Sequence, residues 1–291
     1  MLTGLSTQFC ERFMLLHFFN PVRYLHLLEI VPSKHTNKKF VDAMVRFGEE
    51  RLGKGVVLGK DTVNFVANRI GVYGMMEAMD AVLNHGYTVE EVDAIFGPAL
   101  GRPKSAIFRT ADVVGLDTFI HVANNAYENA KNDECRDSFR IPAFLEQMAS
   151  NGWIGQKSGQ GFYKKDKDKI LALDPKTLQY HEAQKVRFES IGAIRGMSNL
   201  KDKVRSVAYA NDRAGDLFFS LTAKICIYAA NRLGEIADNI VDIDNALKWG
   251  FGWQMGPFEM WDAMGVKKSV ELMQQKGLKP PAWVLKVLSF G

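Results

Sequence analysis

FMLLHFFNPVRYLHLLEIV, the sequence of residues 13–31, contains two short apolar runs separated by Asn-Pro-Val-Arg. The runs cover residues 13–19 and 24–31. Short apolar runs bounded by proline or polar residues are typical of strands rather than helices. We therefore expect a pair of antiparallel strands near the start of the chain.

His17 lies within the first apolar run and Glu29 within the second. Arg23 is midway between them, so a hairpin that turns there places the imidazole opposite the carboxylate. A carboxylate beside a desolvated histidine fixes the tautomer of the ring and stabilises the imidazolium form. The pair therefore fits a general base, although a histidine and a glutamate on neighbouring strands can also be a purely structural pair.

The periodicity of apolar residues becomes helical after Pro32. It predicts a helix over residues 37–52, a short strand over 55–59 and a long, largely buried helix over 65–83. Further helices and turns are expected up to residue 150.

Two later segments have the composition of connections. Residues 152–163 contain four glycines, which predicts a loop. The run KKDKDK at residues 164–169 is polar throughout and predicts a solvent-exposed boundary between two parts of the chain.

The helical part of the chain contains an internal repeat, which we infer from matches at one constant shift with a single one-residue gap. The shift aligns Ala78 with Ala229, Asp93 with Asp244, Gly101 with Gly252, Asp112 with Asp262 and Gly115 with Gly265. Aspartates and glycines match in register as well as apolar positions, so we expect two related helical units. Asn68 falls on Phe219 in this alignment, which predicts that the second unit is not catalytic.

The composition is that of a globular protein of about two domains, with 291 residues, 47% of them hydrophobic. The net charge of +4 is spread along the chain and argues against a nucleic-acid partner. The three cysteines are widely spaced without a CxxC pair, so neither a disulfide framework nor a metal site is expected. No apolar run is long enough to span a bilayer and no signal peptide is recognised, so we expect a cytoplasmic location.

Four motifs occur in the order and approximate spacing of the L-3-hydroxyacyl-CoA dehydrogenase family, which this chain resembles. They are HFFNP at residues 17–21, LLEIV at 27–31, FVANRI at 65–70 and GQGFY at 159–163. The second helical unit, with MGPF at residues 255–258, resembles the duplicated C-terminal domain of the family's longer members.

The resemblance implies a step of fatty-acid β-oxidation, in which the 3-hydroxyl of an acyl-CoA is oxidised to a ketone while a hydride passes to NAD. It implies that His17 removes the hydroxyl proton and that Glu29 orients and charges His17. It also implies that Asn68 positions the substrate oxygen and that Asn20 supports the site on the cofactor side.

The expected fold class is mainly α, with the terminal strand pair of a Rossmann-type NAD-binding domain followed by two related helical C-terminal domains. The expected division is residues 1–31 for the remnant of the NAD-binding domain, 32–163 for the first helical domain, 164–210 for a linker and connecting segment, and 211–291 for the second, degenerate helical domain.

The sequence departs from the family in one large respect, because it contains no GxGxxG turn to hold the pyrophosphate of NAD. We therefore expect a chain that lacks most of its nucleotide-binding domain. Either it is a truncation, or its exposed strands pair with another chain or a second copy. Two smaller departures are Asn64, where the family usually has glycine, and the substrate-contacting hydroxyl, for which Thr3 and Ser6 are both candidates.

Two other functions stay open at this point. The first is a non-catalytic helical module that binds acyl-CoA or mediates oligomerisation, with the His–Glu pair as a relic. The second is a two-domain NAD-dependent dehydrogenase acting on a smaller hydroxy acid or sugar acid. The acyl-CoA substrate is favoured because the HFFNP motif belongs to the acyl-CoA enzymes.

Overall fold

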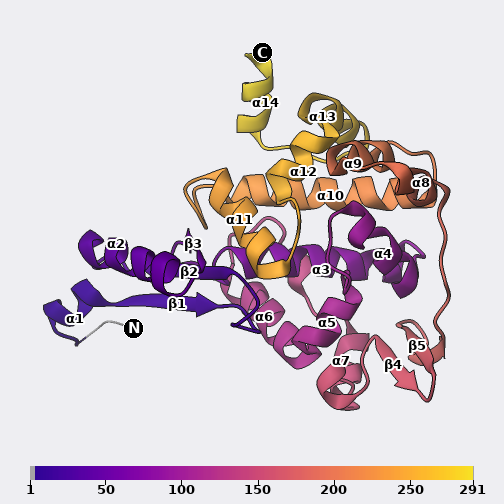
Figure 1. Ribbon diagram of the computed structural model, residues 1–291, viewed down its shortest axis with the longest axis horizontal. Coiled ribbons are helices and arrows are strands. Elements are labelled where there is room, and N and C mark those ends of the chain that lie inside the picture. The colour runs from indigo at the N-terminus through magenta and orange to yellow at the C-terminus, as the bar shows by residue number, and fades with distance from the viewer. Residues whose placement is uncertain (1–3, 291) are drawn as a thin grey trace.

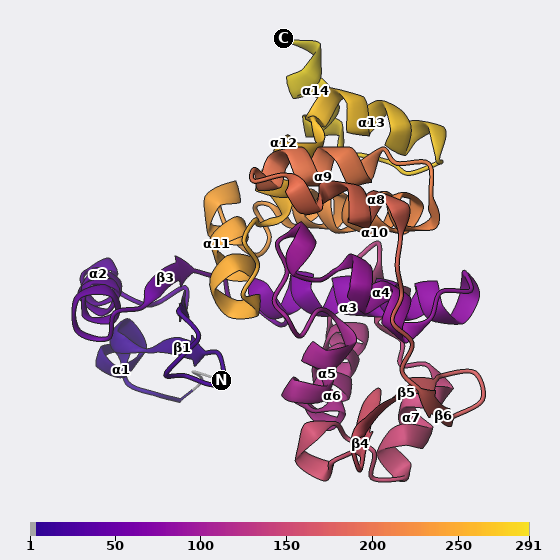
Figure 2. The ribbon, with the colours of Figure 1, turned by 45° about the vertical axis from the view of Figure 1, so that its right-hand side comes forward.

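The computed structural model describes residues 4–290, in which helices predominate and the strands form two separate three-stranded sheets (Figure 1). The expectation of a mainly helical chain with small sheets is therefore confirmed. The N-terminal sheet and the short helix α1 (Thr7–Arg12) lie on one side of the helical body, and the second sheet lies apart from them (Figure 2).

The first sheet has the order β1-β2-β3. Strand β1 (Met14–Phe18) is antiparallel to β2 (Leu27–Pro32), and the register places His17 opposite Glu29, as the hairpin argument predicts. Strand β3 (Gly55–Leu58) pairs parallel with the other edge of β2. The expected strand pair is therefore part of a three-stranded sheet.

A parallel pair needs a crossover connection, and helix α2 (Lys38–Arg46) with the π-turn Phe47–Arg51 supplies it. Asn37 begins this helix by accepting a hydrogen bond from the backbone N–H of Lys39. The N-terminal structural unit thus continues past residue 31 to the end of β3, because backbone hydrogen bonds join β3 to β2.

The helices of the two expected units follow each other in the same order. The first unit contains α3 (Ala67–Asn84), α4 (Val89–Ile95), α5 (Phe108–Val114) and α6 (Leu116–Asn129), and the second contains α10 (Arg213–Arg232), α11 (Ile240–Phe251), α12 (Pro257–Met264) and α13 (Val266–Gln275). The long helices α3 and α10 pack against each other (Figures 1 and 2). Their buried faces form the main hydrophobic core.

Matching aspartates cap the N-termini of equivalent helices in the two units. The carboxylate of Asp93 accepts the backbone N–H of Phe108 at 2.8 Å, and that of Asp244 accepts the backbone N–H of Phe258 at 2.8 Å. Gly115, before α6, has a φ of 94°, and Gly265, before α13, has a φ of 85°. Asp93 and Asp244, like Gly115 and Gly265, therefore carry the same local structure in the two units, whereas Asp112 is buried and its match Asp262 is exposed.

The second unit also contacts the N-terminal sheet, because α11 packs against β2 and β3. A Cβ atom on Gly55 of β3 would come within 2.4 Å of the Trp249 ring, and one on Gly250 would come within 2.8 Å of Leu27. Glycine at these two positions allows the close approach of helix and sheet.

Residues 164–210 are more ordered than the linker we expected. The polar run forms a hairpin between β4 (Tyr163–Asp166) and β5 (Lys169–Asp174), and β6 (Gln179–Glu182) completes an antiparallel sheet. The sheet forms because Ala172 and Leu173 are buried on β5, a short apolar stretch behind the charges. Helices α8 (Glu189–Ala193) and α9 (Leu200–Ala208) follow, and α9 packs against α10 and α12.

The GQGFY motif lies where the glycine-rich loop meets α5. The buried carboxylate of Asp112 accepts the backbone N–H groups of Phe162 at 2.8 Å and Tyr163 at 2.9 Å. A Cβ atom on Gly161 would come within 2.0 Å of this carboxylate. The loop is therefore a packed connection between the glycine-rich segment and α5.

The remaining helices lie at the ends of the helical body. They are α7 (Ala143–Ser150) before the glycine-rich loop and α14 (Ala282–Ser289) near the C-terminus. Among residues 4–290, no helix is both long enough and apolar enough to cross a membrane.

Candidate active site

His17 and Glu29 are in direct contact across the first two strands. Nδ1 of His17 lies 2.5 Å from Oε2 of Glu29. The glutamate side chain is fully buried, whereas that of His17 is 31% exposed. A carboxylate at Nδ1 favours the tautomer that leaves Nε2 as the proton acceptor. Within residues 4–290 no hydrogen bond engages Nε2, so it is free to accept a proton from a ligand.

The second carboxylate oxygen of Glu29 caps the N-terminus of helix α3. Oε1 accepts the backbone N–H of Val66 at 3.1 Å and that of Ala67 at 2.9 Å. The first N–H groups of a helix lack partners within the helix, and the positive end of its dipole favours a carboxylate. One buried side chain therefore holds both the imidazole and the start of the long helix.

Asn68 is the next residue of α3, in its first turn, and its side chain is half-buried. No hydrogen bond to that side chain occurs within residues 4–290, so its amide can bind a ligand. The carboxylate of Glu29 thus contacts the ring of His17 directly, and it also binds the helix turn that carries Asn68.

Two aromatic rings flank the imidazole of His17. The Phe19 ring centroid lies 4.7 Å from that of the imidazole, and the Phe65 centroid lies 5.6 Å from it. These rings limit the access of water to the His–Glu pair on their sides of the imidazole.

The backbone before α3 adopts an uncommon conformation. Asn64 and Phe65 have φ values of 63° and 52°, a region that side chains other than glycine rarely occupy. The Asn64 amide donates to the carbonyl of Val122 at 2.9 Å and accepts from the Asn125 amide at 2.7 Å. Helix α6 therefore fixes the turn that presents Phe65 to His17. The sequence analysis missed Asn125 because nothing in the sequence pattern points to it.

The other predicted site residues lie away from these contacts. Asn20 is exposed at the turn after β1, and its peptide bond to Pro21 is cis. Ser6 accepts a hydrogen bond from the backbone N–H of Phe9 and so begins α1. Thr3 lies outside the described residues.

Arg69, the second residue of the Asn-Arg pair, points into the core and is 1% exposed. Its guanidinium donates to Asp133 and to the hydroxyl of Tyr228 on α10, each at 2.6 Å. It also donates to the backbone carbonyl of Val63 at 3.1 Å. Arg69 therefore ties the start of α3 to the second unit, a role that the sequence analysis did not foresee.

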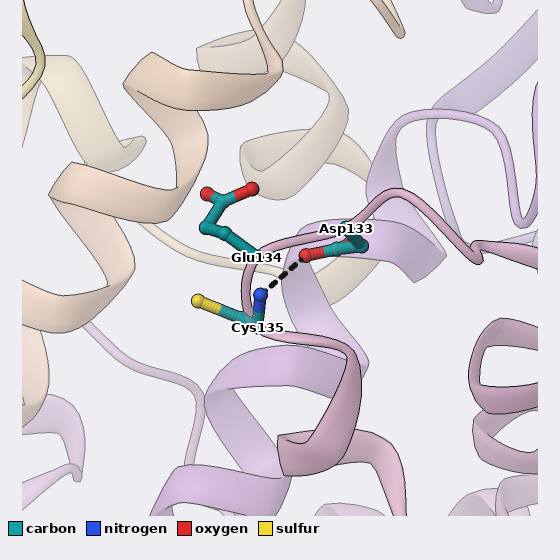
Figure 3. Close-up of side chains that lie close together, drawn as sticks. All are labelled: Asp133, Glu134 and Cys135. Carbon is teal, nitrogen blue, oxygen red and sulfur yellow. Dashed lines mark hydrogen bonds between the residues drawn. The ribbon is translucent and has the colours of Figure 1, made fainter.

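Asp133, Glu134 and Cys135 lie close together between these helices (Figure 3). Asp133 and Glu134 form ion pairs with Arg232, and Asp133 pairs with Arg69 as well. Burial raises the pKa of the Cys135 thiol to about 11, so the thiolate that a metal needs is disfavoured. The cluster is therefore an internal ion-pair network rather than a metal centre.

The second unit lacks a counterpart of this site. Phe219, which matches Asn68 in the repeat, is buried and 1% exposed. The amide of Asn231, from the second Asn-Arg pair, donates to Glu134 at 2.8 Å. The repeat therefore preserves the helices and not the site.

Comparison with known families assigns most of the chain to two domains of one family. Residues 65–165 and again 221–287 match the 3-hydroxyacyl-CoA dehydrogenase C-terminal domain, and residues 4–62 match the NAD binding domain of the same family. The chain belongs to the 3-hydroxyacyl-CoA dehydrogenase family. The C-terminal domain model matches two separate segments of this chain, and the NAD-binding match extends past residue 31 to residue 62.

Two bacterial relatives are similar in sequence. The chain is 52% identical over 291 residues to the "Probable 3-hydroxyacyl-CoA dehydrogenase" of Bacillus subtilis, covering all of this chain and 37% of that protein. It is 49% identical over 165 residues to the protein of the same name in Deinococcus radiodurans, covering 57% of this chain and 47% of that protein. The chain thus spans less than half the length of these two relatives.

A solved structure extends the fold likeness to nearly the whole chain. The 3-hydroxybutyryl-CoA dehydrogenase of Escherichia coli has a TM-score of 0.70 and 19% identity, covering 98% of this chain and 71% of that one. At this level of identity the match supports the fold.

Proposed function

We propose that this chain carries the catalytic part of a 3-hydroxyacyl-CoA dehydrogenase that oxidises the 3-hydroxyl of L-3-hydroxyacyl-CoA in fatty-acid β-oxidation. The observation that carries the proposal is the carboxylate of Glu29, which contacts His17 at 2.5 Å and the first turn of α3 at 2.9 Å. This contact pattern supports His17, Glu29 and Asn68 as the residues that act on the hydroxyl.

The proton of the substrate hydroxyl moves to Nε2 of His17, because Nδ1 is held by Glu29. The carboxylate then stabilises the imidazolium that forms. The Asn68 amide donates a hydrogen bond to the substrate oxygen and orients it. A positioned base of this kind contributes about 10² to 10⁴ in rate.

When bound, NAD would supply the hydride acceptor for the oxidation. The described residues do not fit the whole dinucleotide: the sheet has three strands, and no GxGxxG turn links one of them to a helix. Residues 4–62 thus supply the strand edge with the histidine and no turn for the pyrophosphate. The place of Asn20 beside the cofactor stays a proposal.

We propose the same four segments as expected from the sequence, with the first boundary moved to about residue 62. The pairing of β3 with β2 and the extent of the NAD-binding match support this change. An acyl-CoA partner, pairing of the exposed strands with another chain or a second copy, and a cytoplasmic location also remain proposals.

Incubation of the purified chain with NAD and 3-hydroxybutyryl-CoA, with NADH formation and acyl-CoA binding both measured, tests the proposal. Turnover that is lost in His17→Gln and kept in His85→Gln, an exposed histidine, supports the dehydrogenase. Binding without turnover favours the second candidate, a non-catalytic acyl-CoA module, which the missing GxGxxG turn supports. If the chain shows no binding and no turnover, both functions are contradicted.

A further inference from the structure

Arg102 is a buried cation without a counterion. Arg102 follows the 3-10 turn Pro98–Leu100 and is only 6% exposed. Within residues 4–290 its guanidinium makes no hydrogen bond or ion pair, and Nε is completely buried without a partner. The Trp253 ring stacks on the guanidinium, with its centroid 3.2 Å from the guanidinium carbon.

The charge on Arg102 persists in this environment. Burial lowers the pKa of its guanidinium to about 9, which still leaves the group protonated at neutral pH. A buried charge without a counterion is strongly unfavourable, and stacking on one aromatic ring recovers only part of that cost. An anion bound beside the guanidinium would therefore stabilise the folded chain.

Arg102 lines a cavity of about 30 Å³, which is large enough for a water-sized particle. Its wall includes Trp253 and Phe251, Ile225 of α10, and the bare backbone of Gly71 and Gly74 on α3. The residues that line it include no aspartate or glutamate. The cavity thus offers one positive charge, walls that are mainly apolar apart from Thr110, and no acidic group to repel a negative ligand.

We propose that this cavity binds a small monovalent anionic group, a halide or a carboxylate, on the guanidinium of Arg102. A single cation and a small volume disfavour phosphate and sulfate. The group comes either from solution or from an acid function on the acyl part of a substrate, and the second source rests on the proposed function.

The cavity lies close to the candidate active site. Gly71 is one turn after Asn68 on α3. The Phe251 ring contacts Phe19 with centroids 6.0 Å apart, and Phe19 contacts His17. An acyl group bound at His17 and Asn68 therefore has the cavity as a neighbour, with Phe251 between them.

Thermal unfolding of the purified chain tests the anion site. Chloride or formate should raise the Tm by about 2–4 °C relative to a bulky sulfonate at equal ionic strength. In Arg102→Met this difference should vanish, and the variant should unfold at a higher temperature than wild type in the sulfonate. Arg109→Met is the matched control, because Arg109 also stacks on a ring, Tyr163, but is only half-buried.

Iodide quenching of tryptophan fluorescence gives an independent readout in the wild-type fold. A saturable component should be present in wild type and absent in Trp253→Phe. A Tm response equal in wild type and Arg102→Met, or quenching without a saturable component, would overturn the proposal.

Two CoA esters distinguish the sources: that of 3-hydroxyhexanoic acid and that of the 3-hydroxy six-carbon diacid. A preference of tenfold or more for the diacid ester that disappears in Arg102→Met assigns the anion to the substrate. Equal binding of both esters, with the chloride response retained, assigns it to solution. If neither ester binds, the proposed function fails while the chloride response still decides the anion site.

Discussion

Glu29 accepts the backbone N–H of Ala67 at 2.9 Å, so the residue that holds His17 also begins the helix that carries Asn68. This bond joins two parts of the chain that belong to different matched domains of the family. The position of the candidate base relative to the candidate amide therefore depends on one buried carboxylate.

Glu29→Ala should lower dehydrogenase turnover by about 10² or more, because His17 loses the group that orients it. It should also lower stability by about 1–3 kcal/mol, since the first N–H groups of α3 lose their acceptor. Glu29→Gln keeps an oxygen for that role and should recover most of the stability without the turnover. Denaturant unfolding and steady-state kinetics separate the two effects. Full turnover in Glu29→Gln would contradict the assigned role.

Asn68→Ala should lower turnover while leaving the free energy of unfolding within about 0.5 kcal/mol of wild type, because its half-buried side chain has no bond within the described chain. Asn231→Ala, in the second Asn-Arg pair, is the control and should leave turnover unchanged. Parallel kinetics and thermal unfolding of both variants check this. An equal loss of turnover in the two variants would show that Asn68 acts only through the scaffold.

Asn64→Ala should destabilise the chain by about 2–4 kcal/mol, from strain at a positive φ and two lost side-chain hydrogen bonds. Asn64→Gly loses only the bonds and should cost about 1–2 kcal/mol. Denaturant unfolding of the pair isolates the strain as their difference. Equal losses in the two variants would mean that the backbone at this turn is not strained.

Asp133→Asn should cost about 3–5 kcal/mol, because it leaves the buried guanidinium of Arg69 without its main counterion. Asp42→Asn, which breaks an exposed pair with Lys38, should cost less than about 1 kcal/mol. Urea unfolding measures both. A small effect at Asp133 would mean that water replaces the carboxylate.

Burial raises the pKa of the Asp244 carboxyl from its ordinary 3.8 to about 7. The folded state therefore binds a proton that the unfolded state has released, and the stability this group contributes is present below pH 4 and lost as the pH rises toward 7. The stability difference between wild type and Asp244→Asn should thus fall from pH 4 to pH 7. Asp262→Asn, at an exposed residue, is the control and should show no such trend. A flat difference for Asp244 would contradict the raised pKa.

The local sequence pattern was sufficient for much of the N-terminal fold. The hairpin with His17 opposite Glu29 followed from two apolar runs and the turn between them, because antiparallel register is set over a few neighbouring residues. The strand over residues 55–59 was also predicted, but its place beside β2 was not. A parallel partner is chosen by the crossover helix and by burial of the whole sheet.

In the helical units and the linker, too, the sequence predicted local features and missed those that depend on burial. The repeat was found because Asp93 and Asp244 act within their own units, on helix starts that lie 15 and 14 residues further along the chain. The hairpin at β4 and β5 was missed because its charges obscured the buried pair Ala172 and Leu173.

The amino-acid sequence by itself determined that His17 lies opposite Glu29, since that pairing is set by short-range antiparallel register, whereas Asn68 was identified through the resemblance to the family. Only the tertiary structure decided that Glu29 reaches α3, that Asn125 holds Asn64, and that Arg102 is buried without a counterion. These contacts join residues far apart in the chain. The first two contacts exist because a buried polar atom is stabilised by a partner in whatever packs beside it, and Arg102 has no such partner within residues 4–290; no local pattern records either outcome.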